Sequence, residues 1–529
     1  MCGILALFGV YPKIPSLKPL EHRGPDEKGV FTTEQVYMGH TRLSIVNPEA
    51  GSQPIFWKDW IVIINGEIYN ADLNGKGTDC FVVPPLLEQL DKKAPTQLDG
   101  VFSFVAYRKT DQKIIVARDA IGVTPLYMGT SNGVICFSSL LAAIPIEFTC
   151  EIIPPGHSSS FYLNKIPTFE AWKSPYNPWS DLKLTTTDSD IFIQIMFKAV
   201  EKRLMGDVPW GVLLSGGLDS TIVTAIVSLL ASKRPDYPKV HTFCIGLHDS
   251  PDVLWANKVA NELGTHHTSV VYTVEDAIEA IPTVIKAVET YDVTTIRASI
   301  PMWLLARAIK HRGIKMVLSG EGSDELFAGY LYNLYCPSER HMVDECIRKM
   351  DQLHSYDCAR ANKSMGDWGV ETRVPFLDKE VVRFAMDILH PQYKMSKTHP
   401  EGEKPEKWWL RETFRPYVPE CVVERTKAQF SDAVGSRHIL ELQKAADTLI
   451  TDDMMSKAGR RFPYNTPTTK EAYWYRHLFS SHFQQGNAEK TVLFTPNSIA
   501  CSTGDASTWH ENFKKCLDPS GDAIQTAFA

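Results

Sequence analysis

A glycine turn between two apolar runs is the stretch of this sequence best suited to chemistry. Residues 208–214 are mostly apolar, residues 215–217 read Ser-Gly-Gly, and residues 221–227 are again mostly apolar. This order predicts a buried strand, a tight turn and a helix that begins at the turn. The glycine N–H groups, the Ser215 and Ser220 hydroxyls and the helix N-terminus would together bind a phosphate.

Asp219 distinguishes this turn from a Walker A loop, which would end in Gly-Lys-Ser/Thr. A carboxylate beside a phosphate needs a cation between the two groups, so Asp219 predicts a bound Mg²⁺. The alternative interpretation is a structural strand, turn and helix in which the Ser-Gly-Gly sequence binds nothing.

A second chemical signal lies at the start of the chain, where Cys2 follows Met1. Removal of the methionine would give Cys2 a free α-amino group. One residue would then carry both a nucleophile and a base, which suits attack on an amide carbonyl. An inert cysteine is the alternative at this position.

The loops after the first apolar segments contain the groups that a glutamine substrate needs. Glutamine requires a cation for its α-carboxylate, carboxylates for its α-ammonium group and an oxyanion hole for the developing charge. Arg42, the pair Glu67 and Asp79, and Asn65 with the Gly66 N–H could meet these needs in that order.

Composition limits the function classes. The chain has 529 residues, 44% hydrophobic and 22% charged, which allows two or three globular domains. A net charge of −7 argues against a nucleic-acid-binding surface. The apolar runs are shorter than the ~18 residues of a membrane span, and residues 2–10 lack the basic start of a secretory signal. Eleven scattered cysteines without CxxC pairing predict cytosolic thiols and no zinc site.

The pattern of the chain changes near residue 168. Before it, short β-rich segments alternate with turns; strands are expected at residues 60–65, 101–107, 113–118 and 134–137. Residues 173–181 are rich in Pro, Asn and Ser and form the best linker. After them, strands at residues 240–246, 267–272 and 314–320 alternate with helices, which predicts a parallel, doubly wound sheet. Its ligands would lie at the carboxyl ends of the strands, where residues 215–217 and 319–322 fall.

Several motifs together carry a family resemblance. They are Cys-Gly-Ile at 2–4, His-Arg-Gly-Pro-Asp at 22–26, Asn-Gly-Glu-Ile-Tyr-Asn at 65–70, Ser-Gly-Gly-Leu-Asp-Ser at 215–220, Ser-Gly-Glu-Gly-Ser-Asp-Glu at 319–325, and the segments 289–299 and 369–378. With them the chain resembles glutamine-hydrolysing asparagine synthetases of the B type, from residue 2 to the tail at 518–521.

The resemblance implies a fold and a reaction. An α+β N-terminal-nucleophile hydrolase domain of stacked antiparallel sheets is expected at residues 2–168, a linker at 169–188, and an α/β PP-loop ATP pyrophosphatase domain at 189–529. The implied ligase converts aspartate, ATP, glutamine and water to asparagine, AMP, pyrophosphate and glutamate through a β-aspartyl-AMP intermediate. Ammonia would pass between the domains through an internal tunnel. A homodimer and a cytoplasmic location are also implied.

The resemblance also assigns residues. Cys2, Asn65, Gly66, Glu321 and Lys427 would be catalytic, and Mg²⁺ would be held by Asp219 and Asp324. Glutamine would be bound by Arg42, Leu43, Ile45, Asn65, Glu67 and Asp79, and aspartate by Thr294 and Arg297. The ATP site would comprise Leu214, Ser215, Gly216, Gly217, Asp219, Ser220, Ile245, Ser319 and Gly320. In isolation, Asp324 could be a first-turn acid favoured by a helix dipole, and Arg297 could belong to a surface ion pair.

Two alternatives remain open beside this interpretation. Another PP-loop acyl-adenylating synthetase, such as a β-lactam synthetase, is disfavoured because those enzymes lack the cysteine that Cys2 supplies. A catalytically silent relative would be expected to have lost parts of 215–220 or Glu321. The chain departs from the family where three prolines replace a helix at 11–20, where 71–77 is short, and at Phe81 and Leu140. The two shortened segments thin the shell around the glutamine site.

Overall fold

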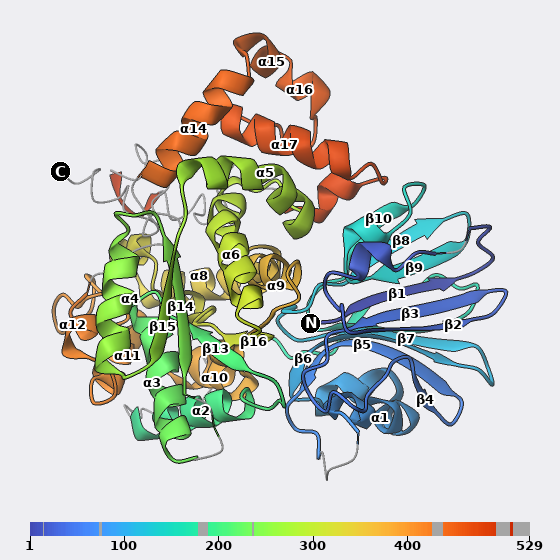
Figure 1. Cartoon of the computed structure of the whole chain (residues 1–529), viewed down its shortest axis with the longest axis horizontal. Helices are drawn as coiled ribbons and strands as arrows, with labels where there is room; N and C mark the ends of the chain where they lie inside the picture. Colours follow the sequence, from blue (N-terminus) through green and yellow to red (C-terminus); the bar gives the residue numbers. More distant parts are fainter. Residues whose placement is uncertain are drawn as a thin grey trace.

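The computed structural model describes residues 1–13, 15–72, 77–177, 189–234, 237, 239–425, 437–493 and 508–511. Figure 1 shows an N-terminal domain of two stacked sheets beside a larger domain in which helices surround a third sheet. The expected fold class is confirmed in both domains.

The N-terminal domain consists of two six-stranded antiparallel sheets, with strand orders β10-β8-β9-β1-β3-β2 and β12-β11-β7-β6-β5-β4. The strands are β1 (Gly3–Phe8), β2 (Glu27–Thr32), β3 (Val36–Arg42), β4 (Ile55–Trp57), β5 (Trp60–Ile68), β6 (Gly100–Arg108), β7 (Lys113–Arg118), β8 (Tyr127–Ser131), β9 (Val134–Ser138), β10 (Thr149–Ile152), β11 (His157–Tyr162) and β12 (Glu170–Ala171). Alternate residues of β1, Ile4 and Ala6, share one buried cluster with Ile61 and Ile63 of β5. The period-two pattern therefore packs one sheet onto the other.

The predicted strands of this domain are confirmed, because all four lie within β5, β6, β7 and β9. Among the described residues of 11–20, the only helix is the 3-10 helix η1 (Lys18–Leu20). Residue 14 lies outside the described residues. Helix α1 (Val83–Leu90), between the 3-10 helices η2 (Asp79–Val82) and η3 (Asp91–Gln97), covers the outer face of the second sheet (Figure 1). The expected linker begins with β12, which pairs with β11 and so continues the sheet; residues 178–188 lie outside the described residues.

The C-terminal domain contains a parallel five-stranded sheet with the order β15-β14-β13-β16-β17. Its strands are β13 (Trp210–Leu213), β14 (His241–Gly246), β15 (His266–Val271), β16 (Met316–Leu318) and β17 (Glu371–Arg373). The helices around it are α2 (Ser189–Lys202), α3 (Leu218–Ser232), α4 (Pro251–Glu262), α5 (Val274–Val288), α6 (Val293–His311), α7 (Ser323–Phe327), α8 (Glu339–Gln352), α9 (Asp357–Gly366), α10 (Lys379–Arg383), α11 (Trp408–Phe414) and α12 (Glu420–Val423). From β13 the chain adds β14 and β15 on one side, and it then adds β16 and β17 on the other side of β13. The loops after β13 and β16 therefore lie next to each other at the carboxyl edge of the sheet, where such folds bind ligands.

Local sequence explains where several of these helices begin. Thr273 and Asp276 form a reciprocal capping box at the start of α5. The Asp292 side chain caps α6 by accepting a hydrogen bond from the Thr295 N–H, and Ser250 caps α4 just before Pro251. These caps set the positions at which the helices leave the sheet.

A helical lobe near the C-terminus joins the two domains. Its helices are α14 (Arg437–Leu449), α15 (Asp452–Ser456), α16 (Ala458–Arg461) and α17 (Lys470–His482), followed by the 3-10 helix η10 (Ala488–Thr491). After α17, the Gly486 carbonyl accepts a hydrogen bond from the Cys150 N–H at 2.7 Å, and the Gly486 N–H donates to Phe148 at 2.9 Å. Figure 1 shows the lobe above both domains. In the part of the chain that the structure describes, no helix is both long and apolar enough to cross a membrane.

Candidate active sites and family

A cavity opens at the carboxyl ends of β13, β14 and β16. Among its lining residues are eight of the nine residues predicted to bind the nucleotide: Leu214, Ser215, Gly217, Asp219, Ser220, Ile245, Ser319 and Gly320. Gly216 instead turns the loop: its φ of +73° favours glycine, and a Cβ there would lie 2.6 Å from the Trp255 carbonyl carbon. The sheet thus brings together two loops that lie a hundred residues apart in sequence.

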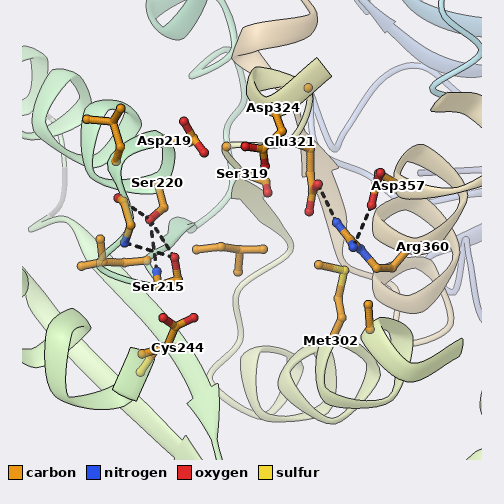
Figure 2. A pocket seen from close by; sticks show the side chains of 18 of the residues that line it. Ser215, Asp219, Ser220, Cys244, Met302, Ser319, Glu321, Asp324, Asp357 and Arg360 are labelled. Carbon is orange, nitrogen blue, oxygen red and sulfur yellow. Dashed lines mark hydrogen bonds and ion pairs between the residues drawn. The ribbon is translucent and has the colours of Figure 1, made fainter. Parts of the chain in front are cut away.

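Hydrogen bonds hold the first of these loops in shape. The Ser215 N–H donates to Ser220 Oγ at 3.2 Å, and the Gly217 N–H donates to Ser215 Oγ at 3.3 Å (Figure 2). Among the described residues, no side chain caps α3, whose N-cap is Gly217. The N-terminal residues of this helix line the cavity, where their N–H groups suit an anion, while Ser220 Oγ also donates to the Gly217 carbonyl at 3.2 Å.

Two carboxylates face one ammonium group at the edge of this cavity. Lys407 Nζ lies 2.7 Å from Asp219 Oδ2 and 2.6 Å from Asp324 Oδ1. Ser323 Oγ also donates to Asp219 Oδ1 at 2.7 Å. The two predicted metal ligands therefore converge, and hard oxygen donors of this kind suit Mg²⁺. Lys407 was not predicted from the sequence, since it precedes a short helix and belongs to none of the motifs.

The opposite wall of the cavity holds a buried cation between acids. Arg360 Nη2 donates to Glu321 Oε2 at 2.6 Å, and its Nη1 lies 2.8 Å from Asp357 Oδ1 (Figure 2). Burial raises the pKa of Glu321, while the Arg360 charge opposes that rise. Burial also raises the pKa of nearby Glu325 to about 8. Arg360 and Asp357 lie on α9 and were missed, because nothing local marks that helix as part of a site.

The predicted aspartate ligands separate in the structure. Thr294 lines the cavity, but Arg297 lies outside its lining. Arg297 instead makes a bidentate ion pair with Glu471 of α17, with Nη2 2.5 Å from Oε2 and Nε 2.9 Å from Oε1. Such a fork-to-fork pair orients the guanidinium toward α17 in this structure, and its role toward aspartate stays a prediction. Lys427 lies outside the described residues.

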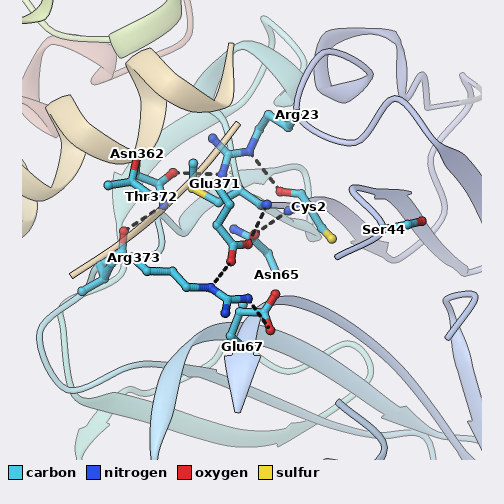
Figure 3. Close-up of polar contacts among 12 residues, drawn as sticks. Cys2, Arg23, Ser44, Asn65, Glu67, Asn362, Glu371, Thr372 and Arg373 are labelled. Carbon is cyan, nitrogen blue, oxygen red and sulfur yellow. Dashed lines mark hydrogen bonds and ion pairs between the residues drawn. The ribbon is translucent and has the colours of Figure 1, made fainter. Parts of the chain in front are cut away.

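A second site surrounds Cys2, between the two domains. The Cys2 N–H donates to Asn65 Oδ1 at 2.9 Å, and the Cys2 carbonyl accepts from Arg23 Nε at 3.0 Å (Figure 3). Asn65 Nδ2 is buried and has no acceptor among the described residues. At Gly66, a Cβ would lie 2.0 Å from the Val101 carbonyl oxygen, so only glycine fits. The predicted oxyanion-hole groups therefore adjoin the predicted nucleophile.

The acids of this site are strongly perturbed. Burial raises the pKa of Asp79 to about 6 and that of Glu67 well above its usual value, where the Glu371 charge adds to the effect. Burial likewise raises the pKa of the Cys2 thiol, against the adjacent Met1 ammonium and a Leu43 backbone hydrogen bond. While Met1 is present, Cys2 is therefore a thiol rather than a thiolate.

The Arg42 guanidinium donates hydrogen bonds to backbone carbonyl groups of the loop that follows it. Its Nη2 donates to the carbonyl oxygens of Asn47 at 2.8 Å and Ala50 at 2.6 Å, and its Nη1 to Pro48 at 3.1 Å. The guanidinium thus orders the loop after Ile45, whose carbonyl accepts a hydrogen bond from the Asp207 N–H of the C-terminal domain at 2.9 Å.

Strand β17 of the C-terminal domain extends into this second site. The Met1 ammonium lies 2.8 Å from Glu371 Oε2, and Arg373 Nε donates to Glu371 Oε1 at 2.8 Å. Arg373 Nη2 lies 3.2 Å from Glu67 Oε2 (Figure 3). Glu371 and Arg373 were not predicted as site residues. Their period-two spacing puts both on one face of the strand, but only the packing of the domains shows what that face meets.

Family models and relatives cover almost the whole chain. The asparagine synthase model matches residues 194–342 and 335–510, and the glutamine amidotransferase domain model matches residues 1–168. An asparagine synthetase [glutamine-hydrolyzing] of Zea mays is 45% identical over 99% of this chain and 94% of its own length. The chain belongs to the asparagine synthase family. An asparagine synthetase [glutamine-hydrolyzing] 2 of Arabidopsis thaliana is 44% identical, again over 99% of this chain and 94% of its own length.

A solved structure of the allosteric regulatory enzyme of purine biosynthesis overlaps 51% of this chain with a TM-score of 0.30 and 13% identity. This overlap adds nothing to the family assignment, which depends on the domain matches and the relatives. The glutamine amidotransferase match ends at residue 168, and the asparagine synthase match begins at residue 194. Cys2, Asn65 and Glu67 fall within the glutamine amidotransferase match, and the residues that line the nucleotide cavity fall within the asparagine synthase matches.

Proposed function

We propose that this chain synthesises asparagine from aspartate, ATP and glutamine. The observation that carries the proposal is the presence of two complementary sites in one chain of this family. One has Cys2 beside an unsatisfied Asn65 amide; the other has a phosphate-type loop beside the carboxylates Asp219 and Asp324. An amide-hydrolysing site supplies ammonia, and a nucleotide site supplies an activated acyl group, so the two chemistries complete one reaction.

The first half-reaction would begin once Met1 is removed. The nitrogen now 2.9 Å from Asn65 Oδ1 would become the Cys2 α-amine, able to take the thiol proton. The thiolate would attack the glutamine side-chain amide, and Asn65 Nδ2 with the Gly66 N–H would bind the oxyanion. Ammonia leaves as the thioester forms, and water then releases glutamate. Glu67 and Asp79 would bind the α-ammonium group of glutamine, and Arg42 with Leu43 and Ile45 would border its α-carboxylate.

The second half-reaction would take place in the cavity at the edge of the parallel sheet. ATP would lie on Leu214, Ile245 and the Ser319-Gly320 backbone, with its β- and γ-phosphates at the 215–220 loop. The donor set fits Mg²⁺, which would be held by Asp219 and Asp324 and would offset phosphate charge when bound. Aspartate near Thr294 would attack the α-phosphate through its β-carboxylate and release pyrophosphate. Lys427 stays a predicted partner of the phosphates.

Helix α9 connects the two proposed sites. Its Asn362 accepts a hydrogen bond from Arg23 at 2.9 Å beside Cys2, and its Arg360 pairs with Glu321 in the cavity. We infer that ammonia passes along this helix from one site to the other. Glu321 would then help neutral ammonia attack β-aspartyl-AMP, which gives asparagine and AMP. A homodimer and a cytoplasmic location stay predictions of the family resemblance.

A product balance tests this proposal. The protein is incubated with aspartate, MgATP and glutamine, and asparagine, glutamate, AMP and pyrophosphate are measured together. Asparagine, AMP and pyrophosphate should form in equal amounts. If AMP and pyrophosphate form with another carboxylic acid but not with aspartate, the chain is a different acyl-adenylating synthetase. If no nucleotide is consumed, it is a silent relative.

A further inference from the structure

We propose that the Lys407 ammonium group occupies the metal position of the nucleotide cavity until a phosphate ligand arrives, so that the divalent cation enters only with that ligand. The proposal rests on the proposed function, because it takes Asp219 and Asp324 as the carboxylates that hold the metal. It adds an order of binding that the carboxylates alone would not impose.

The contacts of Lys407 are those of a bound cation. Its Nζ lies 2.7 Å from both carboxylate oxygens of Asp219 and 2.6 Å from Asp324 Oδ1, with Ser323 Oγ at 3.4 Å. The Lys407 side chain is only 2% exposed, whereas the Asp219 and Asp324 side chains are 15% and 18% exposed. The ammonium thus lies beneath the two carboxylates, which themselves reach the open cavity.

The surrounding backbone is shaped to admit this side chain. Lys407 has a φ of +52°, a left-handed conformation that lysine rarely adopts. A Cβ at Gly329 would lie 1.9 Å from Lys407 Cε and 2.0 Å from Asp324 Oδ1, so a side chain there would expel the ammonium. The absence of a side chain at Gly329 thus leaves the space in which Lys407 and Asp324 meet.

The charges of Lys407 and the two carboxylates determine when a divalent cation can bind. Asp219 and Asp324 bring two negative charges from different helices, α3 and α7 (Figure 2), and Lys407 neutralises one of them. A free dication would have to displace the ammonium or lie next to it, and either costs free energy. A polyphosphate changes the balance because its oxygens attract the ammonium while they coordinate the metal. Lys407 can then move from carboxylate to phosphate on its flexible four-carbon stem.

Manganese(II) binding, followed by electron paramagnetic resonance, tests the proposal without any turnover. Mn²⁺ is titrated into the full chain in the absence of nucleotide. The wild type should bind it weakly, and Lys407→Met should bind one equivalent at least tenfold more tightly. Lys407→Gln serves as a second variant, and thermal melting shows which variants are folded. Lys397→Met, which removes an exposed lysine that contacts only the Tyr335 hydroxyl among its described hydrogen bonds, should bind Mn²⁺ like the wild type.

Two further arms locate the site and can overturn the proposal. Adding Asp219→Asn to Lys407→Met should abolish the gained Mn²⁺ site. Tight binding of free Mn²⁺ by the wild type that is lost in Asp219→Asn would overturn the proposal even if no Lys407 variant folds, as would folded Lys407 variants with no gain. Asparagine formation is measured separately, so a chain that makes asparagine but fails the Mn²⁺ test loses only this inference.

Discussion

Single residues in the Cys2 site combine burial with unmet hydrogen-bonding capacity. Asn65 uses its carbonyl oxygen on the Cys2 N–H and keeps a buried amide nitrogen without an acceptor among the described residues. An unpaired buried donor costs stability, and a developing oxyanion would satisfy it. This cost in stability therefore preorganises the site for the oxyanion.

The first prediction concerns that amide. Asn65→Ala should lower kcat for glutamine hydrolysis by about 10²–10³-fold, because one oxyanion donor is lost. Glutamate release gives the rate, and synthesis with added ammonia should continue in the same preparation. A rate within about threefold of the wild type would remove Asn65 from the oxyanion hole.

The second prediction concerns the pKa of Asp79, which burial raises to about 6. Because the raised pKa leaves the carboxyl neutral below that pH, the glutamine α-ammonium group loses its partner in acid. The Kd for glutamine, measured calorimetrically in a Cys2→Ala background, should rise about tenfold between pH 7 and pH 5. Asp79→Asn should bind more weakly at pH 7 with a shallower pH dependence. An unchanged slope in that variant would assign the titration to another group.

At the scale of elements, strand β17 lies between the two sites. Glu371 and Arg373 extend into the Cys2 site, while the Arg373 carbonyl accepts a hydrogen bond from the Ser319 N–H at 2.9 Å, at the edge of the nucleotide cavity. The side chain of Thr372, between them, points the other way and donates to the Ala361 carbonyl at 3.2 Å. This three-residue strand therefore contacts both the Cys2 site and the nucleotide cavity.

The third prediction compares neighbouring residues of β17. Arg373→Met leaves Glu67 buried without its cation, so Glu67 should become protonated and glutamine binding should weaken at least tenfold. Thr372→Val removes only the hydroxyl that faces away from the site and should leave the glutamine KM unchanged. Both variants should keep ammonia-dependent synthesis. Equal glutamine KM values in the two variants would show that β17 affects the site only through general stability.

The strands and loops that could be predicted from the sequence are those marked by apolar runs and glycine turns. Apolar runs that end in glycine loops predicted β13 and β16, and the rule for parallel sheets correctly placed 215–217 and 319–322 at one edge. Arg360 and Lys407 could not be found that way, because their positions depend on how α9 and the segment before α11 pack. Arg297 shows the converse: the family resemblance implied that it binds aspartate together with Thr294, but its long side chain reaches Glu471 on α17.

At the scale of the whole molecule, a buried charge network joins the domains. Lys363 Nζ on α9 lies 2.7 Å from Glu289 Oε2 and 2.6 Å from the Tyr127 hydroxyl of the N-terminal domain. Glu289 Oε1 accepts from the Ala142 N–H at 2.8 Å. Since both charged side chains are almost completely buried, each depends on the other for compensation.

The fourth prediction tests this network. Lys363→Met should lower the free energy of unfolding by about 3–5 kcal/mol, because Glu289 is left buried without a cation. Lys457→Met, which breaks an exposed pair with Asp453, should cost no more than about 1 kcal/mol. Urea unfolding followed by tryptophan fluorescence gives both values. Similar losses in the two variants would mean that the buried Lys363–Glu289 pair contributes no more than a surface contact.

In the proposed function one chain joins two separable reactions, and Cys2 serves only the release of ammonia. The most direct test is asparagine synthesis by Cys2→Ala with glutamine or with ammonium chloride as nitrogen source. Cys2→Ala should lose glutamine-dependent synthesis and glutamate release, with ammonia-dependent synthesis close to that of the wild type. Glutamate release that persists in Cys2→Ala, or the loss of both activities in a folded variant, would contradict it.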